Sequence, residues 1–219
     1  MSNGMQGLSL EEILAGELNE QSLSDDTFDH WVEITPRALA IHNLNDCKEQ
    51  LERWREQPLK LAQSAKSVHL AMQAALTDAL SGSAGIGAFD DKLRAKYLAY
   101  FEMSREGDAI SPDNDRVLAF EELLQRAIDH PMEWSGQRLK ISPDEKEKLS
   151  RLTSVRNHVE HPRPGAFLVE PRYIAQLLPV AAHLTLKLLD VCIHHYDEGE
   201  REFVQTTVIA VDALCAKIE

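Results

Sequence analysis

The spacing of the apolar residues constrains the fold of this chain more than any other feature. From residue 36 to residue 218 these residues recur at intervals of three and four, which places them along one face of an α-helix. Apart from a short extended candidate at residues 166–169, no segment has the alternation that is typical of a β-strand. The sequence therefore predicts an all-α fold, a helical bundle of about six or seven helices with at most one short hairpin.

Caps, prolines and glycines divide this pattern into separate helices. Thr35-Pro36 supplies an N-cap and a first helical residue, and the segment Ser142–Glu145 adds a capping-box glutamate to the same signals. The glycines of residues 82–87 end the second helix, Pro162 ends the fifth, and Pro179 starts or bends the sixth. The predicted helices cover residues 36–57, 59–81, 90–101, 113–130, 143–161, 177–196 and 204–218.

Length and composition indicate one folded domain behind a polar amino-terminal segment. The chain has 219 residues, and 43% of them are hydrophobic, which is enough for one core. Residues 1–28 are rich in Ser, Asn, Gly and acidic residues, and we interpret them as a mobile arm. Residues 29–219 show no internal repeat and no break in composition. The expected organisation is therefore an arm at 1–28 and a single domain at 29–219.

Net charge, the lack of targeting signals and the cysteine spacing disfavour several classes of protein. The chain has 23 Lys and Arg against 36 Asp and Glu, a formal charge of −13, which disfavours broad binding to nucleic-acid phosphates. No stretch approaches the ~18 apolar residues of a membrane span, and no secretory signal is present, so we expect a cytoplasmic protein without membrane contact. Three cysteines without Cys-x-x-Cys spacing disfavour a disulfide framework or a zinc knuckle: Cys47, Cys192 and Cys215.

The most informative motif is the run from Arg156 to Pro162, Arg-Asn-His-Val-Glu-His-Pro. At ~100° per residue, Arg156 falls within ~60° of the apolar stripe of its helix, where an unpaired charge is costly. One interpretation is an intrahelical ion pair with Glu160, four residues further on. The other is that Arg156, Asn157 and His161 line a cleft at the carboxyl end of the helix.

The Arg-Asn-x-x-x-His spacing resembles that of the HEPN superfamily, named for higher eukaryotes and prokaryotes nucleotide-binding. The motif lies late in an amphipathic helix, a proline-broken turn follows it, and a long helix begins near Leu177. The segment Val68–Leu76 also looks like the paired long helix of HEPN-like bacterial proteins. The resemblance covers roughly residues 36–196.

This resemblance implies a bundle that dimerises so that two Arg-x4-His motifs face one another across a two-fold axis. In active members that composite cleft is a metal-independent endoribonuclease. Carried over, Arg156 would stabilise charge on the phosphate, His161 would transfer a proton and Asn157 would orient a neighbour. The alternative is a catalytically silent HEPN-like dimerisation or interaction module, in which Arg156 is structural.

Partner and cofactor expectations follow from the same region. Residues 138–172 contain eight basic and five acidic residues, a local charge of +3, which suits single-stranded RNA but is more often typical of a solvated helix of mixed charge. We expect a homodimer, with RNA and an antitoxin-like protein as candidate partners and no cofactor. A histidine metal site between the pairs His158/His161 and His194/His195 is a further alternative, and His69 is interpreted as a core residue.

Overall fold

The computed structural model describes residues 34–104, 111–112, 116–191 and 197–218. Within these ranges it contains seven helices of ten or more residues and one of five. The helices are α2 (Pro36–Arg53), α3 (Leu59–Ser81), α4 (Asp91–Ser104), α5 (Phe120–Asp129), α6 (Pro143–Glu160), α7 (Pro171–Ala175), α8 (Leu178–Leu189) and α9 (Glu198–Cys215). The described residues contain no β-strand, so the predicted all-α class is confirmed, while the hairpin is replaced by an isolated antiparallel bridge between Phe89 and Val117.

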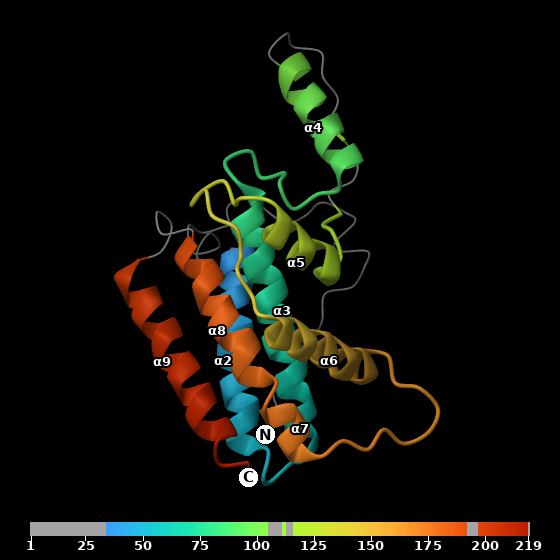
Figure 1. Cartoon of the computed structure of the whole chain (residues 1–219), viewed down its shortest axis with the longest axis vertical. Helices are drawn as coiled ribbons and strands as arrows, with labels where there is room; N and C mark the ends of the chain where they lie inside the picture. Colours follow the sequence, from blue (N-terminus) through green and yellow to red (C-terminus); the bar gives the residue numbers. More distant parts are fainter. Residues whose placement is uncertain (1–33, 105–110, 113–115, 192–196, 219) are drawn as a thin grey trace, which may run out of the picture. The chain divides into compact units, whose positions relative to one another are not determined.

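Four of these helices form a closed bundle. Contacts join α2 to α3, α3 to α8, α8 to α9, and α9 back to α2 (Figure 1). The interior holds large side chains with almost no exposed surface, among them Leu44, Met72, Leu188 and Val211. Burial of this apolar surface is the main term that stabilises the bundle.

Helix α3 is the central element because it touches neighbours on several sides. Beyond α2 and α8 it also contacts α5, α6 and α7. Its alanines Ala65, Ala71, Ala75 and Ala79 are fully buried, and small side chains at these positions let the neighbouring helices approach closely. The position of α6, which carries the Arg156 motif, is set by this packing against α3.

Helix starts follow the local signals of the sequence. The Thr35 hydroxyl accepts a hydrogen bond from the Ala38 N–H at 3.1 Å, ahead of Pro36 in the first turn. At α6 the Ser142 N–H donates to the Glu145 carboxylate at 2.6 Å, and the Glu145 N–H donates to the Ser142 hydroxyl at 3.2 Å. Hydrogen bonds from Ser142 to the carboxylate, the one from its backbone N–H first and the one from its side chain second, lower the pKa of Glu145.

The loop between α3 and α4 depends on two glycines. Gly82 caps α3 with φ of +65°, a conformation that favours glycine. A Cβ on Gly87 would lie 1.8 Å from the Leu80 carbonyl oxygen, so no larger residue fits there. Arg126 of α5 holds the same loop, because it donates to the carbonyls of Gly87 and Phe89 and forms an ion pair with Asp91 at 2.8 Å.

Several predicted helices differ from the observed ones, and the helix expected at 204–218 begins six residues earlier, as α9. The helix expected at 113–130 begins only at Phe120, because Val117 is engaged in the bridge to Phe89; residues 113–115 lie outside the described residues. Of the helix expected at 177–196, α8 covers Leu178–Leu189 with Pro179 in its first turn, α7 precedes it, and residues 192–196 lie outside the described residues. Only Leu93 of the apolar stripe expected on α4 is buried.

Some of the predicted features fall on residues outside the described ranges. The arm expected at 1–28 lies outside the described residues, as do Cys192, His194 and His195. The extended candidate at 166–169 is an irregular loop between α6 and α7. No helix in the part of the chain that the structure describes is long and apolar enough to cross a membrane.

Candidate functional site

The candidate motif occupies the last turn of α6. Leu149, Leu152 and Val155 are buried and pack this helix against α3. His161 is the C-cap, as expected, and its backbone N–H donates to the Asn157 carbonyl at 2.9 Å. The packing of the helix therefore fixes the backbone of Arg156 and Asn157, and the cap fixes that of His161.

Arg156 is held by an ion pair within its own helix. Its Nη2 lies 2.6 Å from Glu160 Oε2, and the two side chains are only 23% and 18% exposed. Its Nη1 donates to Asn157 Oδ1 at 2.9 Å. Glu160 Oε1 in turn lies 3.7 Å from Nζ of Lys66 on α3. The first of the two sequence interpretations, pairing with Glu160, is thus present in the structure.

His69 of α3 is the buried neighbour of this ion pair. Its side chain is 1% exposed, its Nε2 lies 3.2 Å from Thr153 Oγ1, and its ring packs against Phe120 with centroids 4.2 Å apart. The Thr153 hydroxyl donates to the Leu149 carbonyl, so its oxygen is free to accept from the imidazole. Burial, followed by the positive charge of Arg156, lowers the pKa of His69 to about 4. The ring is therefore neutral at neutral pH.

Two nitrogens of this region are buried and have no hydrogen-bond partner within the described ranges: His69 Nδ1 and Arg156 Nε. Unsatisfied buried polar groups carry a free-energy penalty. The sequence interpretation of His69 as a core residue is therefore correct for its burial, but its hydrogen bonding is only half complete.

The histidines of the motif lie away from the Arg156 ion pair. His161 is exposed, and no hydrogen bond or ion pair joins its side chain to another described residue. His158 points to the following loop, where its ring stacks on Phe167 at 3.9 Å and its Nδ1 lies 2.8 Å from the Ser154 carbonyl oxygen. Within one chain a hydrogen bond joins the side chains of Arg156 and Asn157, but no hydrogen bond between described residues joins the side chain of His161 to either of them.

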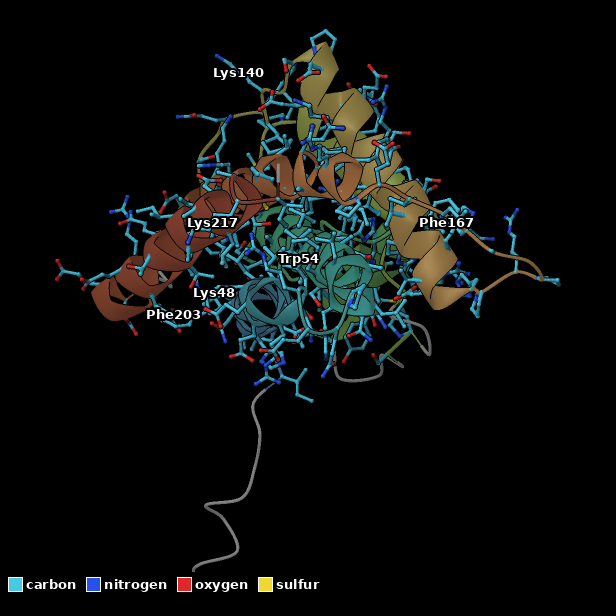
Figure 2. All side chains as sticks on the ribbon, turned by 90° about the horizontal axis from the view of Figure 1, so that it is seen from below. Lys48, Trp54, Lys140, Phe167, Phe203 and Lys217 are labelled. Atoms are coloured by element: carbon cyan, nitrogen blue, oxygen red, sulfur yellow. The ribbon has the colours of Figure 1, made fainter. Side chains whose placement is uncertain are left out.

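The loop after α6 exposes apolar surface beside the motif. Phe167 and Leu168 are 51% and 91% exposed. A hollow of about 330 Å³ lies between this loop and α6, and its lining includes Val155, Phe167 and Tyr173 but neither Arg156 nor His161. Figure 2 shows Phe167 on this loop, beside the helix that carries the motif.

The metal alternative receives no support from the described residues. They contain no group of three His, Cys, Asp or Glu side chains that could hold an ion. His158 is engaged with Ser154 and Phe167, and the pair His194 and His195 lies outside the described ranges.

Sequence reasoning did not find Lys66 and Thr153 as neighbours of the motif. Lys66 lies on α3, and His69 meets Thr153 only because α3 packs against α6, across 84 residues of sequence. Helical periodicity says which face of a helix is apolar, but it does not say which two helices pair.

Comparison with family models, with curated proteins and with solved structures finds no match to this chain.

Proposed function

We propose that this chain is a HEPN-like association module, in which Arg156 holds the end of α6 in place and does not act on RNA. The observation that carries this proposal is the ion pair between Arg156 and Glu160, at 2.6 Å between two side chains that are both mostly buried. A guanidinium that is already neutralised at short range is a poor phosphate ligand, because an incoming phosphate would have to displace the carboxylate.

The proposed partner is a second copy of the chain. The exposed pair Phe167 and Leu168 lies directly after the motif, on a loop that begins at the C-cap of α6. Large apolar side chains that are exposed next to one another favour burial in an interface. Two-fold pairing through this loop would place the two α6 ends near the axis, as the HEPN resemblance implies. An antitoxin-like protein remains the alternative partner.

One observation favours the second candidate, a metal-independent endoribonuclease. Asn157 and His161 are exposed at the same helix end, and Lys66 is close enough to Glu160 to keep that carboxylate paired if Arg156 turned towards a phosphate. In that reaction the ribose 2′-hydroxyl oxygen would attack phosphorus and the 5′-oxygen would leave. His161 would transfer a proton, and Arg156 would stabilise the charge that develops on the phosphate.

Two measurements on the purified chain separate these functions. Light scattering reports self-association, and we expect a dimer that Leu168→Asp converts to monomer while the melting temperature stays unchanged, because Leu168 is almost fully exposed. Incubation with a labelled single-stranded RNA reports cleavage, and we expect none. Leu59→Asp is the matched control, since it makes the same change of side chain and charge at a residue that is 78% exposed and distant in sequence from the loop.

Either of two results would contradict the proposal of a non-catalytic association module. RNA cleavage that His161→Ala abolishes at unchanged melting temperature would establish the nuclease instead, provided that a chelator does not affect the cleavage. A strict monomer at micromolar concentration would contradict both the dimeric module and the composite nuclease site.

A further inference from the structure

A hollow at one end of the bundle holds a second group of charged residues. Its volume is about 550 Å³, and it lies where the end of α2, the start of α7 and the residues after α9 meet. We call it the basic hollow, and its lining residues are Trp54, Arg55, Glu170, Pro171, Arg172, Lys217 and Ile218. Figure 2 views the bundle from this end and labels Trp54 and Lys217.

The basic hollow has an excess of positive charge in an acidic protein. Three cations line it against one carboxylate, in a chain whose formal charge is −13. Arg55 lies 5.9 Å from the centre of the Trp54 ring and donates to the Lys217 carbonyl at 3.2 Å. None of Arg55, Arg172 and Lys217 is in an ion pair with another described residue. Cations are favourable near the carbonyl ends of α2 and α9, but that weak interaction does not neutralise them.

A second hollow continues the first and has a different character. It has a volume of about 560 Å³ and shares Arg172 and Ile218 with the basic hollow. The rest of its lining is mainly apolar or uncharged: Ala175, Gln176, Pro179, Cys215 and Ala216, with Asp212 at its edge. Burial raises the pKa of Cys215 to about 12, so its thiol is uncharged, and the Asp212 carboxylate lies 2.8 Å from Nε2 of His183.

We propose that this groove binds an extended acidic peptide, with carboxylates in the basic hollow and apolar side chains in the adjoining hollow. Positive charge lies at one end of the groove only, and it is complementary to a ligand with carboxylates at one end. The groove is positive around Arg55, Arg172 and Lys217 and becomes apolar, with one carboxylate, towards Asp212. A nucleic-acid strand has a phosphate at every nucleotide and would bring negative charge along the whole groove. A peptide can carry its charges at one end only, and Trp54 offers an aromatic surface for its side chains.

This inference is independent of the proposed function, because the groove shares no residue with the motif at the end of α6. It needs neither self-association nor cleavage. The cations lie on three segments that are far apart in sequence, at residues 55, 172 and 217, and only the fold brings them together.

The test uses the full chain and a fluorescein-labelled peptide, Asp-Glu-Asp-Leu-Ala-Leu, followed by fluorescence anisotropy. We expect saturable binding with a Kd below about 1 mM that weakens as salt is raised. Arg172→Glu and Lys217→Glu should each weaken binding about tenfold or more, since each reverses a charge against the peptide carboxylates. Both residues are exposed, so the variants should fold, and circular dichroism checks this.

Two controls and one further variant test whether the acidic peptide binds in this groove. Arg138→Glu makes the same charge change at an exposed site outside the groove and should leave binding within about twofold of wild type. A peptide with lysine in place of each acidic residue should not bind. Trp54→Ala should weaken binding of the acidic peptide if the variant folds. The proposal is overturned if Arg138→Glu weakens binding as much as Arg172→Glu, if the acidic peptide does not bind at 1 mM, or if a six-nucleotide RNA binds more tightly at the same residues.

Discussion

Two groups of charged residues in this molecule differ in how their charges are balanced. At the end of α6, Arg156 lies 2.6 Å from the Glu160 carboxylate, and both side chains are largely withdrawn from water. In the basic hollow, Arg55, Arg172 and Lys217 are exposed and have no described ion-pair partner. The first group has its counter-ion within the same helix. In the second group the Glu170 carboxylate lines the same hollow, but it forms no ion pair with any of the three cations.

This difference indicates which arginine is structural. Removing an ion from water costs free energy that a well-placed counter-ion recovers, so a half-buried arginine needs its partner in order for the helix to pack. An exposed cation keeps its hydration and can exchange it for a ligand at small cost. Arg156, which lies in the motif with a catalytic resemblance, is therefore the better candidate for a structural role. The three cations of the basic hollow, which belong to no sequence motif, are the better candidates for binding a ligand.

The largest expected effect concerns His69, the buried histidine on which the charge of Arg156 acts. Its pKa is about 4 in the folded chain against an ordinary value of 6.5, so the unfolded chain binds the proton more readily. The stability that the neutral ring contributes is complete above pH 6.5 and is lost as pH falls towards 4. The difference between the two pKa values corresponds to roughly 3 kcal/mol. Urea unfolding at pH 7 and at pH 4 measures it.

His69→Leu is the control for that pH dependence. This variant removes the titrating group, so its loss of stability between pH 7 and pH 4 should be smaller than that of wild type by roughly 3 kcal/mol. Carboxylates such as Glu145, whose pKa is lowered, also lose stabilising contacts in acid, and the comparison cancels their contribution. An equal loss in wild type and His69→Leu would show that the ring is not held neutral at this contact.

A double-mutant cycle tests the ion pair itself at a smaller scale. For Arg156→Ala and Glu160→Ala we expect a coupling free energy of about 1–2 kcal/mol, because the pair is mostly buried. The same helix offers a matched control in Arg151 and Glu147, which have the same four-residue spacing but are 46% and 61% exposed. Their coupling should be about 0.3–0.5 kcal/mol. Equal coupling in both pairs would remove the distinction between the two arginines.

The sequence predicted those features that local signals encode. The caps at Thr35 and Ser142, the end of α3 at Gly82 and the position of His161 all follow from a few adjacent residues. The pair Arg156 and Glu160 also follows, because a spacing of four sets it within one turn. The late start of α5 does not follow, since it depends on a bridge between Val117 and Phe89 from another segment.

The contacts that define both charged groups depend on helix pairing. His69 meets Thr153, and Arg55 meets Lys217, across 84 and 162 residues of sequence. Periodicity predicts the apolar face of each helix. Because several helices have similar apolar faces, it does not predict which helices pack against each other. Polar residues at such contacts are hard to find for the same reason, and His69 could be predicted as buried but not as a neighbour of Arg156.

The smallest expected effect concerns the cations of the basic hollow. Arg172→Ala and Lys217→Ala should each change the free energy of unfolding by less than about 0.5 kcal/mol, because an exposed cation without an ion-pair partner contributes little to the folded state. The double variant should be additive, and low salt should make it slightly more stable than wild type if the two like charges repel. Urea unfolding at two ionic strengths measures both effects. A loss above 1 kcal/mol in either single variant would mean that the cation supports the packing of α7 or the end of α9, and the hollow would then resemble the end of α6.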